Sequence, residues 1–239
     1  MWGGLAALIG AGGAALAMGA ASAPAVGTTD RSAIETIVRE YILSHPEILP
    51  EAMRNLEMRE AAKVVAANRS ALETPFGGAW DGSAKGDITL VEFFDYNCGY
   101  CRASLPVIER LLAEDKQLKV VYREVPILGE ASVEAAQHSL AVAQLGGYRA
   151  FHRTLFDAGR SSASAIDAAI AKAGADPAKV KAAKASPAIA AEINANLELQ
   201  RTLGMNGTPG WVVGDRVFNG AVGYDALKAA IAEVRASKG

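Results

Sequence analysis

The sequence predicts an α/β domain preceded by a long helical segment, and three observations lead to this prediction. A β-α-β unit over residues 88–125 surrounds the only two cysteines of the chain. A stretch without strand-like runs follows, from about residue 130 to 204, and a β-β-α unit ends the chain. Before all of these, residues 30–72 carry apolar side chains at helical spacing.

The composition is typical of a globular protein. The chain has 239 residues, of which 51% are hydrophobic and 21% charged, and its formal net charge is -2. This length is enough for one sizeable domain and an appended segment. No cluster of Lys and Arg and no basic stripe alternating with aromatic residues stands out, so we expect no nucleic-acid partner.

The N-terminus has the features of an export signal. No charged residue precedes Asp30, residues 5–20 are moderately apolar, and Ala23-Pro24-Ala25 offers small residues for cleavage. We therefore predict a signal peptide over residues 1–25 and a periplasmic location, although the Lys or Arg that usually starts such a segment is lacking. The alternative is an uncleaved membrane anchor facing the periplasm, for which the many Gly and Ala residues are only weakly hydrophobic.

Residues 26–73 are predicted to form a helical stalk. Apolar residues recur at helical spacing over residues 34–42 and again over residues 48–65, and residues 44–52 interrupt the pattern. A helix of about 40 residues extends on the order of 60 Å and has little of its own chain to pack against. We expect its apolar stripe to be buried against copies of itself. The alternative is that it folds back onto the main domain.

The main domain is expected over residues 74–239 and starts with a Gly-rich boundary, residues 74–87. The elements expected after it are a strand at 88–94, a helix at 102–115, a strand at 118–125, Ala-rich helices in an insert over about 130–204, strands at 211–214 and 216–220, and an amphipathic helix from 224 to about 235.

The two cysteines are spaced C-x-x-C between the first strand and the helix. Cys98 would start the helix, where unpaired N–H groups and the helix dipole favour a thiolate, the reactive form of cysteine. Cys101 lies one turn further on and can close a disulfide with Cys98. This arrangement predicts an exposed, attacking Cys98 and a more buried, resolving Cys101. Pro106, inside the helix, should kink it.

Two other interpretations of the cysteine pair are weaker. A structural zinc site wants four ligands, and beyond the cysteines only His45, His138 and His152 remain, at spacings unlike those of zinc fingers. A structural disulfide between residues three apart removes little chain entropy. We therefore predict redox catalysis with no metal and no cofactor, and we interpret His138 and His152 as packing or surface residues of the insert.

The order of these motifs resembles the thioredoxin fold with a DsbA-type helical insertion. The resemblance rests on the C-x-x-C helix with Pro106, the insert, and Gly-Thr-Pro-Gly at 207–210 before the last hairpin, and it extends from about residue 88 to the C-terminus. Residues 39–60 also resemble the stalk of the ScsC and Com1-like branch of the DsbA family. Members of that branch include trimers that are held by such helices and act as disulfide isomerases.

The resemblance implies a thiol–disulfide oxidoreductase or isomerase and its partners. These would be client proteins with cysteines or disulfides, a membrane redox protein that recycles the cysteine pair, and further copies of the chain, with a trimer favoured. Thr208 and Pro209 match the cis-proline loop, which lies against the active-site disulfide and presents its backbone to a substrate. Thr208 also matches a position that tunes redox behaviour.

Three further residues acquire roles from the resemblance. Glu92 matches a buried acid beneath the active site that would accept a proton from Cys101, and the alternative is an acid exposed by strand alternation. Gly99 and Tyr100, between the cysteines, would set the thiol pKa and the redox potential. They differ from the Pro-His pair of DsbA, so a strongly oxidising potential is not implied. Trp211 is expected in the core or at the lip of a substrate groove.

Two rival functions remain open at this point. A monomeric dithiol oxidase or reductase would use the same cysteines without the stalk. A copper-binding protein of the copper-tolerance type would hold Cu(I) on the two soft thiolates, and copper stress is linked to the ScsC branch. Arg123 and Glu124 could form a pair near the active site or lie on the surface.

Overall fold

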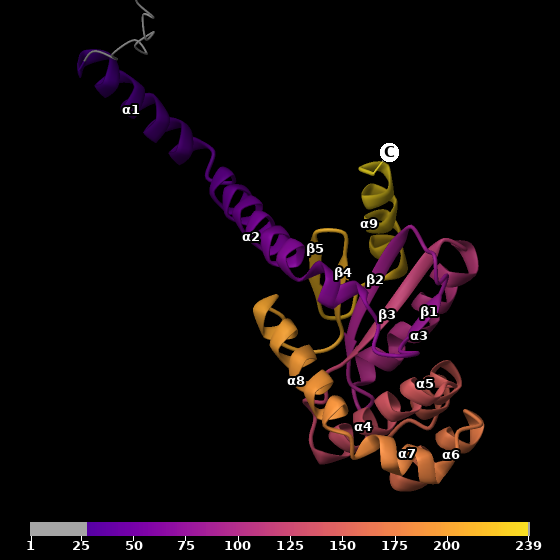
Figure 1. Cartoon of the computed structure of the whole chain (residues 1–239). Coiled ribbons are helices and arrows are strands. Elements are labelled where there is room, and N and C mark those ends of the chain that lie inside the picture. Colours follow the sequence, from indigo (N-terminus) through magenta and orange to yellow (C-terminus); the bar gives the residue numbers. More distant parts are fainter. Residues whose placement is uncertain (1–27, 239) are drawn as a thin grey trace, which may run out of the picture. The chain divides into compact units, whose positions relative to one another are not determined.

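The computed structural model describes residues 28–238, so the expected signal peptide lies outside the described residues (Figure 1). The chain divides into two units, with the boundary between Ala52 and Met53. No helix of the described residues is both long and apolar enough to cross a membrane.

The first unit contains helix α1, Thr28–Ser44, and the start of helix α2, Ile48–Glu73. Pro46 lies in the turn between them, where its missing N–H and its restriction of the preceding residue favour a helix end. The Ser44 hydroxyl donates to the carbonyl oxygens of Glu40 (2.7 Å) and Tyr41 (3.1 Å). The expected interruption of the helical segment is therefore present, and Ser44 closes α1.

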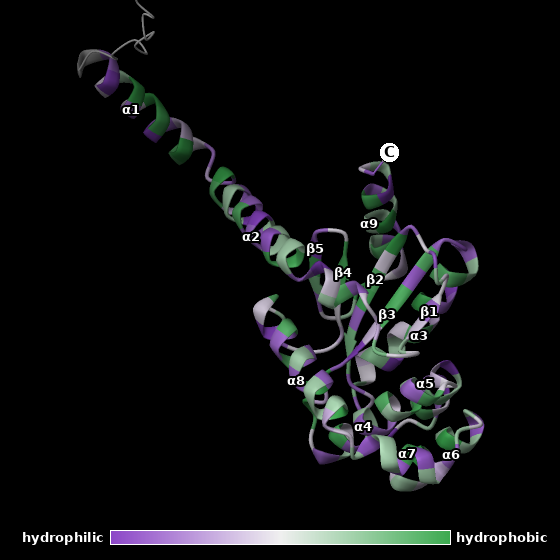
Figure 2. Cartoon of the chain, in the orientation of Figure 1, coloured by the Kyte–Doolittle hydropathy of each residue, from purple (hydrophilic) through white to green (hydrophobic). Residues whose placement is uncertain are grey.

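The apolar side chains of α1 are exposed. Hydrophobic and hydrophilic bands alternate along this helix (Figure 2), as expected for an amphipathic sequence. Four large apolar residues at positions i, i+3, i+4 and i+7 keep half or more of their surface in solvent: Ile34 (51%), Ile37 (65%), Val38 (50%) and Tyr41 (53%).

The second half of α2 belongs to the core of the second unit. Val65 and Leu72 are buried and pack in one cluster with Val91, Phe93 and other residues of the sheet. The predicted stalk, residues 26–73, therefore differs from the structure at its C-terminal end. Folding back onto the domain, the alternative weighed for this segment, applies to these last turns of α2.

A five-stranded mixed sheet lies in the second unit, in the order β1-β3-β2-β4-β5. Strands β2 and β3 are parallel, and the other neighbouring pairs are antiparallel. The strands are β1 Trp80–Gly82, β2 Ile88–Phe94, β3 Leu118–Glu124, β4 Gly210–Val213 and β5 Arg216–Asn219. The four predicted strands are confirmed to within a residue or so, whereas the sequence analysis missed β1.

Seven helices complete the described part of the second unit, and the thioredoxin-type order with a helical insertion is confirmed. Figure 1 shows α4 to α7 grouped at one end of the sheet. The helices are α3 Gly99–Glu114, α4 Glu130–Leu145, α5 Tyr148–Asp157, α6 Ala163–Lys172, α7 Pro177–Lys184, α8 Pro187–Thr202 and α9 Tyr224–Ala236, in addition to the packed end of α2.

The two faces of the sheet are covered by different helices. Strands β2 and β3 are buried almost throughout, as expected for near-continuous apolar strands at the centre of a sheet. Leu90 and Phe94 point to the face that packs against α3 and α9, together with both cysteines. Val91 and Phe93 point to the face covered by α8 and the end of α2. Successive residues of a strand alternate between faces, so Glu92 points to the cysteine side.

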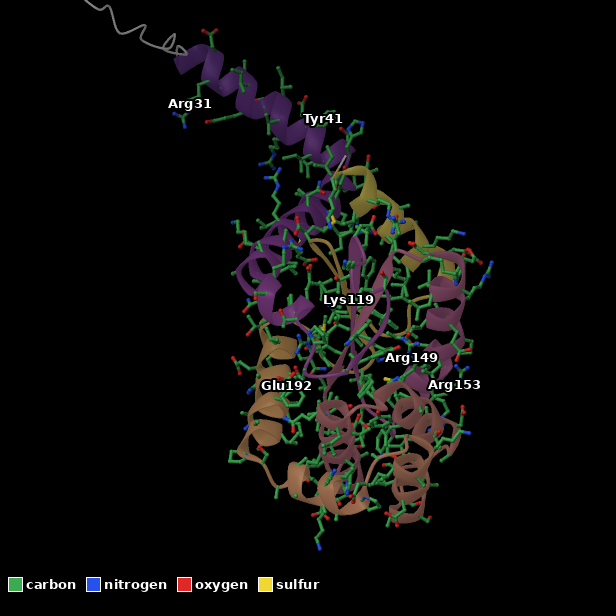
Figure 3. The ribbon with its side chains drawn as sticks, turned by 45° about the vertical axis from the view of Figure 1, so that its right-hand side comes forward. Arg31, Tyr41, Lys119, Arg149, Arg153 and Glu192 are labelled. Carbon is green, nitrogen blue, oxygen red and sulfur yellow. The ribbon has the colours of Figure 1, made fainter. Side chains whose placement is uncertain are left out.

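Arg123 joins the end of α2 to α8. Its guanidinium is buried and donates to the carbonyl oxygens of Leu72 (3.0 Å), Thr74 (2.6 Å) and Ala71. It also donates to Glu192 Oε1 (2.8 Å), and Figure 3 shows the position of Glu192 on α8. Both expectations for Arg123 were wrong, because its charge partner is Glu192 and it satisfies carbonyl groups that the helix end leaves free. Glu124 is buried as well.

Candidate active site

Cys98 is the N-cap residue of α3. Its backbone is extended (φ -79°, ψ 116°), and its Sγ accepts a hydrogen bond from the backbone N–H of Cys101 at 3.3 Å. The N–H of Cys98 in turn donates to the carbonyl oxygen of Asp95 at 3.0 Å. The strand end and the helix start therefore hold this sulfur at the positive end of the helix dipole.

Both cysteines are free thiols and both are largely covered. Cys98 is 6% exposed and Cys101 0%. The predicted order of exposure holds, but Cys98 offers only a small window to solvent. A reagent or a client disulfide can reach the Cys98 sulfur only through this small exposed area, and it cannot reach the sulfur of Cys101.

A loop far away in the sequence closes the other side of Cys98. The Thr208–Pro209 peptide bond is cis, as the resemblance implies, and the Cys98 thiol donates to the carbonyl oxygen of Thr208 at 3.3 Å. Gln200 on α8 supports the loop by donating from Nε2 to the carbonyl oxygen of Gly207 (3.0 Å). A Cβ at Gly210 would lie 2.6 Å from Met205 Sδ, so this close approach requires glycine.

The two thiols have opposite acidities. Hydrogen bonds from the Cys101 thiol, the Thr208 side chain and the backbone N–H groups of Cys101 and Tyr100 lower the pKa of Cys98 to about 5, although burial acts against them. Burial, followed by the hydrogen bond to Cys98 and the charge of Glu92, raises the pKa of Cys101 well above its ordinary value. At neutral pH the pair therefore consists of one thiolate and one thiol.

Glu92 is a buried acid on the cysteine side of β2. It is 1% exposed, which rules out the alternative of a solvent-exposed carboxylate. Its Oε2 has no hydrogen-bond partner among the described residues. Burial, and then the charge of Cys98, raises the pKa of Glu92 well above its ordinary value, which favours the protonated carboxyl group.

The residues between the cysteines contribute mainly backbone. Tyr100 is 70% exposed, and a Cβ at Gly99 would meet nothing within 4 Å. Their N–H groups lie in the first turn of α3, and that of Tyr100 favours the thiolate of Cys98. The Tyr100 ring is therefore free to contact a client protein.

The remaining candidates from the sequence have structural positions. Trp211 is fully buried and donates from Nε1 to the carbonyl oxygen of Gly220 (3.1 Å), so it belongs to the core and forms no groove lip. His152 is buried among aromatic rings, including Tyr96 (centroids 5.5 Å apart), and burial lowers its pKa to about 3. Its interpretation as a packing residue is confirmed.

Two residues that the sequence analysis did not select, Asp95 and Asn97, hold the turn before Cys98. Asp95 Oδ1 accepts from the N–H of Asn97 (2.8 Å), and Oδ2 accepts from the N–H groups of Ile127 (2.9 Å) and Leu128 (3.0 Å). Their position directly before the C-x-x-C is the one sequence signal that could have identified them.

Residues 28–238 contain no group of three or more His, Cys, Asp or Glu side chains that could hold a metal ion. The titratable side chains that meet at this site are the two thiols and the buried acid Glu92. A thiolate at the start of a helix, a buried thiol one helical turn away and a cis-proline loop on a thioredoxin-like sheet define a thiol–disulfide oxidoreductase.

Comparison with known proteins agrees with this class. Residues 89–232, more than half of the chain, match the DSBA-like thioredoxin domain, and residues 30–63 match the copper resistance protein ScsC N-terminal domain. The chain therefore belongs to the family of DSBA-like thioredoxin domains, in its ScsC-type branch, and the resemblance inferred from the sequence is confirmed. No curated protein sequence matches the chain.

Several solved structures are similar to the chain. A thioredoxin-like oxidoreductase from Silicibacter pomeroyi DSS-3 is 37% identical, with a TM-score of 0.67, and the match covers 70% of this chain and 98% of that one. A linker-deletion mutant of Proteus mirabilis ScsC is 29% identical, with a TM-score of 0.69 over 90% and 100% of the two chains. A periplasmic thioredoxin-like protein from Salmonella enterica serovar Typhimurium is 31% identical, with a TM-score of 0.64 over 70% and 95%.

Proposed function

We propose that this chain is a periplasmic thiol–disulfide interchange protein that attacks client disulfides with Cys98, resolves with Cys101 and acts as an oligomeric disulfide isomerase. The observation that carries the proposal is the contrast between the two thiols. The pKa of Cys98 is lowered to about 5, whereas the pKa of the fully buried Cys101 is raised.

The proposed reaction conserves atoms and electrons at each step. The Cys98 thiolate attacks one sulfur of a client disulfide, a Cys98–client disulfide forms, and the other client sulfur leaves as a thiolate. In isomerisation, another client thiolate attacks the mixed disulfide and releases Cys98 unchanged. In reduction, Cys101 loses its proton and attacks Cys98 Sγ, the Cys98–client bond breaks, and the second client sulfur leaves as a thiolate. The protein then holds the Cys98–Cys101 disulfide and the client has gained two electrons.

Glu92 is proposed to exchange a proton with Cys101. When Cys101 attacks, its proton passes to the Glu92 carboxylate, and when Cys101 is the leaving group in the reverse direction, protonated Glu92 returns it. A buried carboxyl group with a raised pKa suits both steps, because it takes up a proton readily when it is ionised and can return that proton inside the protein. Its raised pKa keeps charge out of the core whenever Cys98 is a thiolate.

The residues around the sulfurs are proposed to tune and present the reaction. Thr208 and the backbone of Gly99 and Tyr100 favour the thiolate and so set the redox potential. Thr208 and Pro209 present backbone to a client strand, and the exposed ring of Tyr100 supplies apolar contact to it.

Self-association is proposed to occur through α1 and the first half of α2. In one chain the four residues of the α1 stripe remain half exposed or more, and in α2 Leu49, Met53 and Leu56 are also exposed. Residues that recur at i, i+3, i+4 and i+7 form the kind of stripe that helices bury against one another. A trimer is favoured, and its active sites could act together on one misfolded client.

Two substitutions within the full-length chain test the oligomer and the isomerase together. Ile37→Gln with Tyr41→Gln removes the apolar stripe of α1, whereas Ser32→Gln with Thr36→Gln places the same residues on the opposite side of the helix. We expect wild type and control to sediment as oligomers and to refold a protein with scrambled disulfides, and the stripe variant to lose both properties. A monomeric wild type, or a stripe variant that isomerises equally well, would contradict the proposal and favour a monomeric oxidase or reductase.

The periplasmic location rests on the signal-like residues 1–25 and on the periplasmic relative from Salmonella. In that compartment a membrane redox protein would recycle the cysteine pair. Fusing residues 1–40 to a reporter that is active only after export tests this location. A reporter that stays inactive would contradict it.

A copper-binding role has one observation in its favour, the match to the N-terminal domain of a copper resistance protein. Cu(I) would bind both sulfurs as thiolates, and the raised pKa of Cys101 opposes this. Reduced protein should therefore lose Cu(I) to a competing chelator while it exchanges readily with glutathione disulfide. Tight copper binding without exchange would favour the copper-binding role.

A further inference from the structure

Asn97, directly before Cys98, forms hydrogen bonds through its backbone N–H and through both ends of its side-chain amide. Its N–H donates to Asp95 Oδ1 (2.8 Å). Its Nδ2 donates to the hydroxyls of Ser132 (2.9 Å) and Ser161 (2.7 Å), and its Oδ1 accepts from the N–H of Ser161 (3.1 Å). An amide offers two donor hydrogens and one carbonyl acceptor, so the side chain is satisfied on every side.

The partners of the Asn97 side chain all belong to the helical insert. Ser132 lies in the first turn of α4, and Ser161 lies between α5 and α6. The Ser161 hydroxyl also donates to the carbonyl oxygen of Ala131 (3.1 Å), which joins these two parts of the insert to each other. Ser132 and Ser161 are both buried, so these hydrogen bonds are shielded from competition with water.

The position of Cys98 Sγ depends on this turn. The backbone donors that favour its thiolate lie in the first turn of α3, and on its other side Sγ contacts the carbonyl oxygen of Thr208 (3.3 Å), 110 residues away in the sequence. Hydrogen bonds to sulfur weaken quickly with a small displacement. A turn that is free to move would therefore lose part of this stabilisation.

We propose that Asn97 is a positioning residue that clamps the active-site turn to the helical insert, through Ser132 and Ser161, and so holds Cys98 Sγ against its hydrogen-bond donors. The proposal rests on the proposed function, in which Cys98 is the attacking thiolate. The helical insert would then contribute to the reactivity of Cys98, because its residues Ser132 and Ser161 hold the active-site turn in place.

The test is the pH dependence of Cys98 alkylation in the full-length reduced protein, with the modified cysteine identified by mass spectrometry. For Asn97→Ala we expect the midpoint to rise by about one pH unit, which lowers the ratio of thiolate to thiol about tenfold at a given pH. Ser132→Ala and Ser161→Ala should shift it in the same direction by less. Neither should add a further shift in the Asn97→Ala background, because the contact is already lost.

Two controls separate positioning from general loss of stability. Ser164→Ala removes a nearby exposed hydroxyl whose partner is Ser162 (3.0 Å) and should leave the midpoint unchanged. Val180→Ala removes buried volume from α7 without touching Asn97; it should lower stability and leave the midpoint unchanged. The other titratable groups near Cys98, which are Cys101 on α3, Glu92 on β2 and Asp95 in the turn, are the same in every variant.

Each result decides the proposal. A folded Asn97→Ala protein with the wild-type midpoint, or a Val180→Ala protein with the same shift as Asn97→Ala, would overturn it. If Asn97→Ala does not fold, the two serine variants decide, and unchanged midpoints in both would overturn it. A wild-type midpoint at the ordinary value of about 8.5 would instead overturn the proposed function on which it rests.

Discussion

Replacing Glu92 by Gln should shift the free energy of unfolding increasingly in favour of the variant as the pH rises. The unfolded chain loses the Glu proton around pH 4.3, whereas burial raises the pKa of Glu92 in the folded state. Between these two pKa values the folded protein binds more protons than the unfolded one, so its stability falls as the pH rises. Gln has no proton to lose and should escape this fall.

The size of the effect follows from the linkage between protons and folding. One proton contributes at most about 1.36 kcal/mol per pH unit. Between pH 5 and pH 7, the advantage of Glu92→Gln over wild type should therefore grow by up to about 2.7 kcal/mol while both values lie below the folded pKa. Burying the Gln amide changes the free energy of unfolding by the same amount at every pH, so this cost cancels when the two pH values are compared.

The assay is urea unfolding of the oxidised proteins at several pH values. In the oxidised form the disulfide removes the titration of Cys98 and Cys101, and the buried groups Glu124 and His152 are common to both proteins. Glu57→Gln, at an exposed position of α2, serves as a matched control and should leave the unfolding free energy unchanged. An advantage of Glu92→Gln that stays flat or shrinks toward pH 7 would refute the protonated, buried acid.

Three further results are expected. Arg123→Met should cost about 3–5 kcal/mol, measured by urea unfolding, because it leaves the buried carbonyl groups at the end of α2 and the partly buried carboxylate of Glu192 without their partner. A loss under about 1 kcal/mol would contradict this. Leu72→Ala should lower the free energy of unfolding by about 2–5 kcal/mol, because it removes a buried side chain. If Ile37→Ala on α1 lowered it by the same amount, this would argue against packing of the end of α2. Thr208→Val should raise the pKa of Cys98 above about 5 by removing a hydroxyl donor, and an unchanged alkylation midpoint would contradict that role.

The parts of the fold that sequence reasoning identified are those with a strong local pattern. The strand at Ile88–Phe94 is an apolar run rich in β-formers, and the hairpin near Gly214 carries a turn signal between two such runs. Strand β1 has only three residues, one of them glycine, and exists because Trp80 pairs with Val121 of a strand later in the chain. Such a strand has no periodicity of its own to detect.

The residues of the candidate site also fall into two groups, those that a local sequence pattern identifies and those that only the folded structure brings together. Cys98 and Cys101 are recognisable because the chemistry of the pair is contained in four consecutive residues. The Asn97 contacts join residues 35 and 64 positions apart, and Arg123 reaches a helix end about 50 positions earlier. Hydrogen bonds between distant segments follow from tertiary packing, and neither the local spacing of residues nor the composition predicts them.

The central claim is that Cys98 is the attacking thiolate and Cys101 the closed, resolving thiol. It is tested most directly by the reaction of two reduced single variants, Cys101→Ser and Cys98→Ser, with glutathione disulfide at pH 6. Because a thiol with a pKa of about 5 is mostly ionised at that pH, Cys101→Ser should form a one-to-one mixed disulfide at least about tenfold faster than Cys98→Ser. Equal rates, or faster reaction through Cys101, would contradict the claim.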